Sequence, residues 1–163
     1  MTAPTLTFRP AARADLPVLV GMLADDPLGQ TREQATEPLP EAYELAFAAI
    51  DADPHNELIA VEDGDGSVVA TLQLTFIPGL SLMGGERLQI ESVRVHPDWR
   101  SRGIGEQVFQ WAIERGRARG CRLVQLTTNK ARGDALRFYE RLGFTASHEG
   151  LKLMLVPPPN LAT

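Results

Sequence analysis

One junction limits what this chain can fold into more than any other feature. Residues 93–120, VRVHPDWRSRGIGEQVFQWAIERGRARG, join an alternating apolar run to an amphipathic pattern through a loop rich in arginine and glycine. The apolar spacing after the loop predicts a helix over 104–119. A strand that leads through such a loop into a helix directs free backbone N–H groups and the positive end of the helix dipole at one point. The junction therefore predicts a site for phosphate oxygens.

Four residues of this loop support an anion site. Gly103 and Gly105 lack the Cβ atoms that would block a close approach, and Arg100 and Arg102 add positive charge. The loop fits no nucleotide fingerprint, because Val108 stands where Gly-x-Gly-x-x-Gly needs its third glycine and no Lys-Ser/Thr pair completes a P-loop. Dinucleotide-dependent oxidoreduction and nucleoside triphosphate chemistry are therefore disfavoured.

The rest of the chain predicts alternating strands and helices with short connections. We expect strands at 6–10, 57–63, 67–77, 87–95, 122–128 and 151–156, and helices following Asp15, around 43–50, over 104–119 and over 134–142. GDG at 64–66 predicts a hairpin turn. The polar, proline-broken segment 25–40 is expected to be a loop that contacts substrate.

Charge is unevenly distributed along the chain. The net charge is −5, which argues against general binding to nucleic acid or to an anionic membrane. Residues 87–141 hold twelve Arg and Lys against six Asp and Glu, whereas the remainder holds four against fifteen. One part is thus suited to anions and the other to cations, although Arg115, Arg117 and Arg119 also suit a solvated helix end.

Length and cysteine content set further limits. The 163 residues fit one domain, 1–163, and no apolar run approaches the roughly 18 residues of a membrane span, so a cytoplasmic protein is expected. The single cysteine, Cys121, excludes an internal disulfide and is expected to be a core residue. The three histidines show no metal-ligand spacing, so no metal is expected.

The pattern Arg100-x-x-Gly103-x-Gly105 after a strand ending in VRVHP resembles the acyl-CoA loop of the GCN5-related N-acetyltransferase (GNAT) superfamily. FRPAARADLPVLVGML resembles the first strand and helix of that family, and DALRFYERLGF resembles its late helix. The three motifs span residues 8–144 in the family's order. The resemblance implies an α/β (α+β) fold with a mixed, bent sheet of about six to seven strands and about four helices.

The resemblance also implies where acetyl-CoA binds. The fourth and fifth strands, 87–95 and 122–128, splay apart to admit it. The cofactor-binding residues that carry over are Val93, Arg94, Val95, Arg100, Ser101, Arg102, Gly103, Ile104, Gly105, Glu106, Asn129 and Phe138. Many relatives keep an asparagine seven residues before the late tyrosine, but Arg132 holds that position here and Asn129 lies ten residues before it. The contact to pantetheine is therefore expected from Asn129, from Arg132 or from the backbone.

Chemistry assigns two catalytic candidates. An alkyl amine has a pKa of about 10, so a base must remove its proton before the nitrogen attacks a thioester. Glu91, expected on the strand face of Val93 and Val95, is a candidate base, directly or through water, with a structural salt bridge as the alternative. Tyr139 matches the tyrosine that acts as the general acid in the family, and the alternative role for Tyr139 is packing in the core. The free N–H of Val93 is expected to stabilise the oxyanion.

The expected function is N-acetyl transfer from acetyl-CoA to a primary amine in a ternary complex. A small-molecule amine is favoured over a protein lysine as the acceptor, and a homodimer is an open possibility. The alternative is a non-catalytic acyl-CoA-binding regulator or sensor, against which Tyr139 argues.

Overall fold

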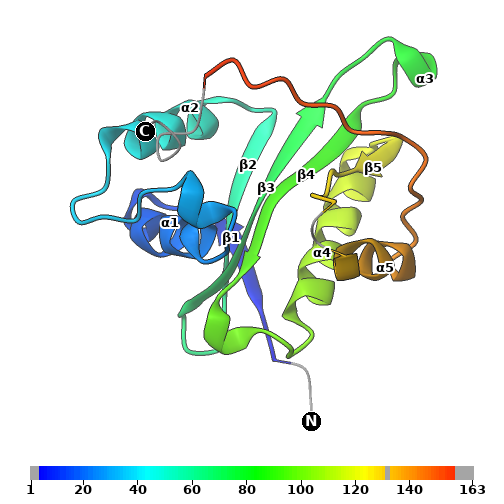
Figure 1. Ribbon diagram of the computed structural model, residues 1–163. Coiled ribbons are helices and arrows are strands. Elements are labelled where there is room, and N and C mark those ends of the chain that lie inside the picture. The colour runs from blue at the N-terminus through cyan, green and yellow to red at the C-terminus, as the bar shows by residue number, and fades with distance from the viewer. Residues whose placement is uncertain (1–3, 131–132, 157–163) are drawn as a thin grey trace.

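The computed structural model describes residues 4–130 and 133–156, which form a five-stranded mixed sheet with helices on both faces (Figure 1). The strands are β1 (Thr7–Pro10), β2 (Asn56–Glu62), β3 (Val68–Ile77), β4 (Arg87–Val95) and β5 (Leu123–Gln125). The helices are α1 (Leu16–Ala24), α2 (Glu41–Ala52), α3 (Ser81–Gly84), α4 (Ile104–Arg119) and α5 (Gly133–Arg141). Strands lie side by side in chain order, and only β4 and β5 are parallel.

This architecture confirms the expected fold class, with one correction in the strand count. A mixed sheet and four longer helices are present, but the described residues contain five strands rather than six or seven. The segment 151–156, expected as the last strand, has no regular structure, and the strand expected at 122–128 is limited to Leu123–Gln125. The sheet therefore ends at the short β5 on this side.

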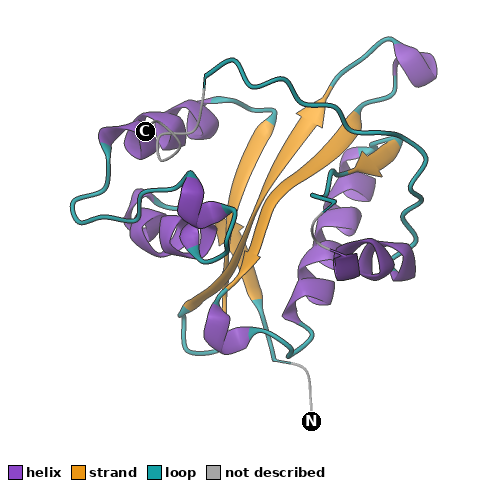
Figure 2. Ribbon diagram, viewed as in Figure 1, coloured by secondary structure: helices purple, strands orange, loops and turns teal. Residues whose placement is uncertain are grey.

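Two helices cover each face of the sheet. Figure 2 shows α1 and α2 on one side and α4 and α5 on the other. The core between the sheet and α4 is built from fully buried apolar side chains, among them Leu72, Leu74, Phe76, Leu88, Ile104 and Val108. Phe8 of β1 stacks on Trp111 of α4 with ring centroids 4.6 Å apart, so Trp111 is a packing residue, as expected. The site-bearing helix α4 is therefore fixed to the sheet along its length.

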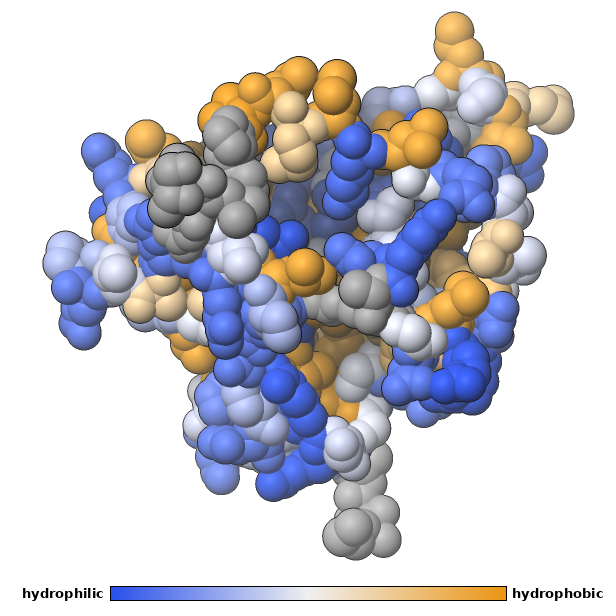
Figure 3. All heavy atoms as spheres, in the orientation of Figure 1, coloured by the Kyte–Doolittle hydropathy of each residue, from blue (hydrophilic) through white to orange (hydrophobic). Residues whose placement is uncertain are grey.

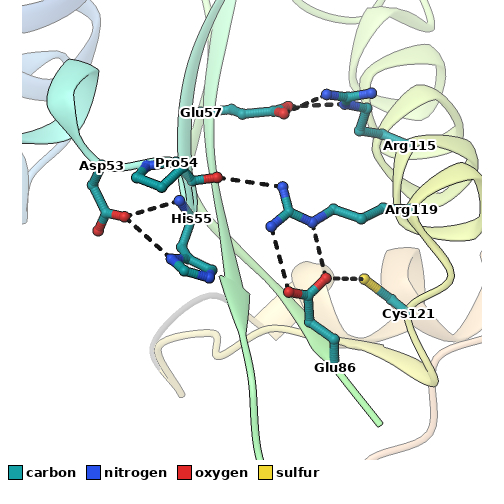
Figure 4. A network of polar contacts seen from close by, with 8 residues as sticks. All are labelled: Asp53, Pro54, His55, Glu57, Glu86, Arg115, Arg119 and Cys121. Carbon is teal, nitrogen blue, oxygen red and sulfur yellow. Dashed lines mark hydrogen bonds and ion pairs between the residues drawn. The ribbon is translucent and has the colours of Figure 1, made fainter.

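Ion pairs hold the C-terminal end of α4 in place (Figure 4). Arg115 Nε donates to Glu57 of β2 at 3.0 Å, and Arg119 Nε donates to Glu86 at 2.9 Å. The Arg119 guanidinium also lies 3.9 Å from the ring centroid of Phe76 and lowers the pKa of Glu86 below its usual range. These two arginines thus pair with one carboxylate in β2 and one directly before β4, at the end of α4 opposite to the glycine loop.

Cys121 begins the segment that leads into β5. Its Sγ lies 3.7 Å from Glu86, and burial raises the pKa of the thiol. Because a thiol with a raised pKa is a poor nucleophile, the side chain fits the packing role expected from the sequence.

β4 and β5 separate soon after they begin. They pair only at the three positions that join Arg87–Gln89 to Leu123–Gln125, and β4 continues to Val95 without β5 beside it. The far side of this part of β4 is still bonded to β3. The expected splaying of the fourth and fifth strands is therefore present.

Two further findings bear on the classes of function. No helix within residues 4–130 and 133–156 combines the length and apolarity needed to cross a membrane. In the same residues, no three His, Cys, Asp or Glu side chains gather in a way that would hold a metal ion.

Candidate functional site: the open edge of β4 and the start of α4

The loop between β4 and α4 is shaped by two residues in left-handed backbone conformation. Ser101 has φ of 61° and Gly103 has φ of 76°. Gly103 directly precedes Ile104, the first residue of α4, and the glycine relieves the steric cost that a Cβ brings at positive φ. The loop therefore turns sharply into the helix, as the sequence predicts.

The first turn of α4 presents backbone donors. The N–H of Gln107 bonds to the carbonyl of Gly103 at 3.2 Å and is the first of the helix ladder. The N–H groups of Ile104, Gly105 and Glu106 precede that bond, so they have no partner within the helix. They point out of the helix end where the dipole is positive, which is the geometry that binds phosphate oxygens.

The packing of the protein itself does not require a glycine at position 105. A Cβ at this position would lie 3.9 Å from Cζ of Phe138, an ordinary contact distance. Its φ is that of a normal helix residue. The open space in front of Gly105 is therefore available to a ligand that approaches the first turn.

A β-bulge interrupts β4 just before the open edge. The register with β3 shifts between Thr71 and Gln73, so that Ser92 and Val93 together oppose one residue of β3. Ser92 adopts φ of 54°, which accommodates the extra residue. The bulge reverses which face the later side chains occupy.

This reversal corrects one expectation about Glu91. Leu88 and Ile90 are buried in the core beneath α4, and Val93 and Val95 pack against the same cluster. Glu91 is exposed on the opposite face. The prediction that Glu91 shares a face with Val93 and Val95 is therefore wrong, because it assumed an unbroken alternation of period two.

The bulge also determines which backbone groups face the gap. The N–H of His96 bonds to the carbonyl of Val69 on β3 at 2.8 Å. In an antiparallel pair every second residue bonds to the partner, so Arg94 also turns its backbone to β3. The N–H and C=O groups of Val93 and Val95 turn the other way, toward the side from which β5 has departed. These are the two residues expected to pair with pantetheine.

Two arginines lie along this edge. Arg94 Nη1 donates to the carbonyl of Val93 at 2.9 Å, and Arg100 Nε donates to that of Val95 at 3.2 Å. Arg102 instead lies over the Trp99 ring, 4.8 Å from its centroid. The edge of β4 thus carries accessible backbone polar groups that side chains of the same chain contact.

Sequence reasoning missed the partners of these arginines. Asp25, just after α1, accepts a hydrogen bond from Arg100 at 2.6 Å, and Asp26 lies 3.4 Å from Arg94. The Asp26 carboxylate also accepts the N–H of Gly29. The only signal in the sequence is the DD pair itself, and nothing local links it to a loop some 75 residues later. These contacts tie the open edge of β4 and the loop before α4 to the start of the segment 25–40.

Tyr139 and Phe138 lie on α5, beside the first turns of α4. The Tyr139 ring is half-buried and packs edge-on against Phe109, Phe138 and Phe144, with centroids 5.3, 5.4 and 6.1 Å apart. Gly143, at φ of 91°, ends the helix as predicted. The fold therefore brings α5 and the glycine loop together, although they are about 35 residues apart in sequence.

Asn129 is exposed and follows the end of β5. The alternative contact, Arg132, lies outside the described residues. The choice between them stays a prediction.

Comparison with known proteins identifies the family. A family model described as the acetyltransferase (GNAT) family matches residues 23–144. The chain is 35% identical over 109 residues to the aminoalkylphosphonate N-acetyltransferase of Salmonella typhimurium, covering 66% of this chain and 69% of that protein. It is 32% identical over 90 residues to the glucosamine 6-phosphate N-acetyltransferase of Trypanosoma brucei brucei, covering 55% of this chain and 59% of that one.

A solved structure is similar over almost the whole fold. The crystal structure of a transcriptional regulator from Bacillus halodurans C-125 superposes with a TM-score of 0.89 at 52% identity, covering 93% of this chain and 100% of that one. Together with the open edge of β4, these similarities show that the chain belongs to the acetyltransferase (GNAT) family and is an acetyl-CoA-dependent N-acetyltransferase.

Proposed function

We propose that this single-domain enzyme, residues 1–163, acetylates a small primary amine by direct attack of the amine on acetyl-CoA within a ternary complex. The observation that carries the proposal is the edge of β4, where the backbone groups of Val93 and Val95 face the gap left by β5. This edge leads directly into the donors at the start of α4. An extended amide-bearing arm followed by a pyrophosphate matches that order of groups.

In this proposal the chain holds the cofactor largely through its backbone. Val93 and Val95 pair with the amides of pantetheine, and the N–H groups from Ser101 to Glu106 bind the pyrophosphate. Arg94 and Arg100 must then release the two carbonyls that they contact, which frees both guanidinium groups to face phosphate. Phe138 borders the space in front of Gly105. Asn129 reaches pantetheine from the β5 side of the gap.

Acetyl-CoA supplies an activated thioester, and residues of the chain move the protons. Glu91 takes a proton from the amine, directly or through water, so that the nitrogen lone pair can form the C–N bond. The N–H of Val93 stabilises the negative charge that develops on the carbonyl oxygen. As the C–S bond breaks, Tyr139 donates its proton to the departing thiolate, and the amide and free thiol are the products.

The acceptor is proposed to be an amine that also carries a phosphonate or phosphate group. Both curated relatives described above are named for such acceptors. The acidic remainder of the chain suits an ammonium group, and the loop 25–40 contains a single basic residue, Arg32, whose side chain is 45% exposed. Its Nε lies 3.3 Å from the Glu33 carboxylate, so in this proposal the guanidinium exchanges that exposed ion pair for the anionic group beside the amine.

Two measurements test this proposal. Thermal unfolding should shift upward with acetyl-CoA, by an amount equivalent to about 2.7 kcal/mol at 100 times the dissociation constant. Thiol release with 2-aminoethylphosphonate should then follow Michaelis–Menten kinetics, and Tyr139→Phe should lower kcat by about 10²- to 10⁴-fold while the thermal shift is retained. Phe144→Leu, in the same aromatic cluster, is the control for lost packing.

One outcome would favour the non-catalytic alternative. If acetyl-CoA stabilises the fold but no amine yields thiol release, the chain is an acyl-CoA-binding regulator. The name of the Bacillus halodurans relative, a transcriptional regulator, is what favours this second candidate. Equal activity of the wild type and Tyr139→Phe would instead remove the tyrosine from the mechanism.

A further inference from the structure

A row of amide and hydroxyl side chains crosses the face of the sheet that α1 and α2 partly cover. Its half-buried members come from three neighbouring strands and are Asn56, Gln73, Thr75 and Gln89. Glu91, on the same face, is exposed, whereas Thr71, two residues before Gln73, is only 2% exposed. The helices therefore cover the start of β3 and leave the later part of this face open.

The open part of the sheet is a hollow of polar character. Figure 3 shows hydrophilic side chains in a hollow between α2 and α4, below an apolar upper rim that includes the turn between β3 and β4. β3 is the middle strand of the sheet, with β2 and β4 on either side of it. Polar side chains that stay accessible at the middle of a sheet are suited to a ligand.

Asp53, directly after α2, fixes the direction of the Asn56 amide. Its Oδ1 accepts the backbone N–H of His55 at 2.8 Å (Figure 4), and its Oδ2 accepts Asn56 Nδ2 at 2.7 Å. These hydrogen bonds, with the one from His55 first, hold the pKa of Asp53 below its usual range. Because an ionised carboxylate can only accept, Asn56 must present its nitrogen to Asp53 and its oxygen to β3.

The direction of Asn56 determines that of Gln73. Asn56 Oδ1 accepts Gln73 Nε2 at 3.2 Å and Thr75 Oγ1 at 2.8 Å. A carbonyl oxygen can only accept, so Gln73 must use its nitrogen in this contact. Among the residues that the structure describes, no donor meets the other end of the Gln73 amide. The carbonyl oxygen Oε1 is therefore the group that Gln73 offers to a ligand.

Gln73 lies directly opposite Glu91. The two residues are Cα partners of the antiparallel pair β3 and β4, and such partners have Cβ atoms about 4.5–5.5 Å apart. Both side chains point away from the core beneath α4, which Leu74 and Ile90 fill. Two residues after Glu91, Val93 offers its backbone to the gap beside β4. Two oxygen acceptors thus lie next to the proposed position of the thioester.

We propose that Gln73 is a specificity-determining residue: its carbonyl oxygen accepts one N–H of the acceptor amine and thereby selects primary over secondary amines. This inference rests on the proposed function and deepens it, because it names the kind of nitrogen that the site takes. Asp53 and Asn56 are positioning residues, since they hold the Gln73 amide in the required direction without touching the amine.

The selectivity follows from the number of N–H bonds. Once the ammonium group has lost one proton through Glu91, which is exposed and returns it to water, a primary amine has one lone pair and two N–H bonds. With the lone pair directed at the thioester carbon, one N–H points to Gln73 Oε1 and the other to the side of Glu91. As the C–N bond forms and the C–S bond breaks, the N–H beside Glu91 gives its proton to that carboxylate or to water. The N–H on Gln73 stays as the N–H of the amide.

A secondary amine cannot satisfy both acceptors. Its neutral form has a single N–H, which must leave as the proton during the reaction. The second alkyl group then meets Gln73 Oε1 and separates this oxygen from any donor. An unpaired polar group in a site built for a hydrogen bond is what disfavours the wrong substrate.

Thiol release from matched amines tests the role of Gln73. The probes are 2-aminoethylphosphonate and propylamine, each compared with its N-methyl derivative. The wild type should have the higher kcat/KM for the primary member of each pair. Gln73→Met keeps the length of the side chain and removes the amide, so it should lower the ratio of primary to N-methyl amine about tenfold and retain the thermal shift with acetyl-CoA.

The matched control for this substitution is Gln125→Met. It removes an amide from the same face of the sheet, where Gln125 Nε2 donates to Gln89 at 2.7 Å on the other side of β4. This variant should keep the wild-type ratio. A loss of the ratio in both variants would mean that polarity of the face in general, rather than the Gln73 oxygen, discriminates between the amines.

Asp53→Asn tests the direction of the hydrogen bonds without changing Gln73. The oxygen of the new side chain still has to accept the N–H of His55, so its nitrogen faces Asn56, which must turn its own oxygen toward it. Gln73 then turns its oxygen to the Asn56 nitrogen and its nitrogen to the amine. The ratio should therefore fall at least as far as in Gln73→Met, although position 53 does not touch the substrate.

The outcomes separate this inference from the proposed function. Thiol release by the wild type with an unchanged ratio in Gln73→Met or in Asp53→Asn would overturn the inference and leave the proposed function standing. An equal loss of activity with the primary and the N-methyl amine would overturn it too, because a packing defect slows both alike. If the wild type released thiol with none of these amines, the proposed function would be wrong and the inference would be overturned with it.

Discussion

Arg100 and Asp25 join the loop that precedes α4 to the segment that follows α1. Arg100 Nη2 lies 2.6 Å from the Asp25 carboxylate, and its Nε donates to the carbonyl of Val95. In the proposed complex this guanidinium turns to a phosphate group, so the ion pair competes with acetyl-CoA. If the proposal is correct, Asp25 opposes cofactor binding although it lies 75 residues from Arg100 in the sequence.

We predict that Asp25→Asn binds acetyl-CoA more tightly. Both side chains of the pair are more than 40% exposed, so the pair contributes only about 0.2–1 kcal/mol, and affinity should rise about 1.5- to 5-fold. Titration calorimetry at low salt is the measurement, and the gain should shrink in high salt. Asp98→Asn, which removes a charge near the same loop, should change affinity less; an equal gain would indicate a general charge effect.

Gly105→Ala should separate ligand binding from stability. The added Cβ has room at 3.9 Å from Phe138, and alanine is the better helix former, so the free energy of unfolding should be unchanged or rise by up to about 1 kcal/mol. Acetyl-CoA affinity should fall about tenfold, because the methyl group occupies the approach to the first turn. Gly21→Ala in α1 also has open space and serves as the control, which should bind normally. Normal binding by Gly105→Ala would show that the ligand does not approach this turn.

Arg32→Ala should weaken recognition of an anionic acceptor. We expect KM for 2-aminoethylphosphonate to rise about tenfold, since a charge-assisted hydrogen bond is worth about 1.5–3 kcal/mol. KM for a neutral alkyl amine should be unchanged, and Arg117→Ala, at the far end of α4, should behave as the wild type. A matching rise in KM for both amines would contradict a direct contact with the phosphonate.

The buried Asp15 carboxylate makes stability depend on pH. Arg9 donates to it through two nitrogens, at 2.7 and 3.0 Å, and the N–H of Ala12 donates at 2.7 Å. The Arg9 guanidinium lowers the pKa of Asp15 below its usual range. A lowered pKa contributes stability that is complete above the unfolded value of about 3.9 and is lost as the pH falls through the folded value.

Asp15→Asn should therefore lower the free energy of unfolding by about 1–3 kcal/mol at pH 7, because Arg9 loses its bidentate partner. The difference from the wild type should shrink in urea titrations as the pH falls below about 3.9. Asp51→Asn, on the exposed face of α2, should follow the wild type at every pH. A difference that does not change with pH would mean that packing rather than charge is lost.

Local patterns predicted the elements that carry the site. The α4 bounds, 104–119, follow from the glycine loop and the helical spacing of apolar residues, and both signals lie within the segment itself. The end of α5 before Gly143 and the hairpin turn at 64–66 were likewise predicted from glycines within the segments themselves. The separation of β4 and β5 was predicted only from the resemblance to the family, because no local sequence pattern indicates it.

Features that depend on distant partners escaped prediction. RLQIESVRV alternates without a break, so nothing in it marks Ser92 as an inserted residue; the bulge is visible only against β3. The pairing of Asp25 and Asp26 with Arg100 and Arg94 needs the folded chain. The strand expected at 151–156 has the right composition, but composition cannot supply the neighbouring strand.

The bulge at Ser92 divides β4 into two parts. Odd-numbered side chains lie on one face of the sheet before the bulge and on the other face after it. Before it, Glu91 presents a carboxylate to the face covered by α1; after it, Arg94 presents a guanidinium to that same face, while Val93 offers backbone to the gap. A regular strand would place Val93 and Val95 on the face of Glu91. One extra residue thus places a carboxylate, a guanidinium and an open backbone edge within the nine residues of β4, and its deletion would move the later side chains of the strand to the opposite face of the sheet.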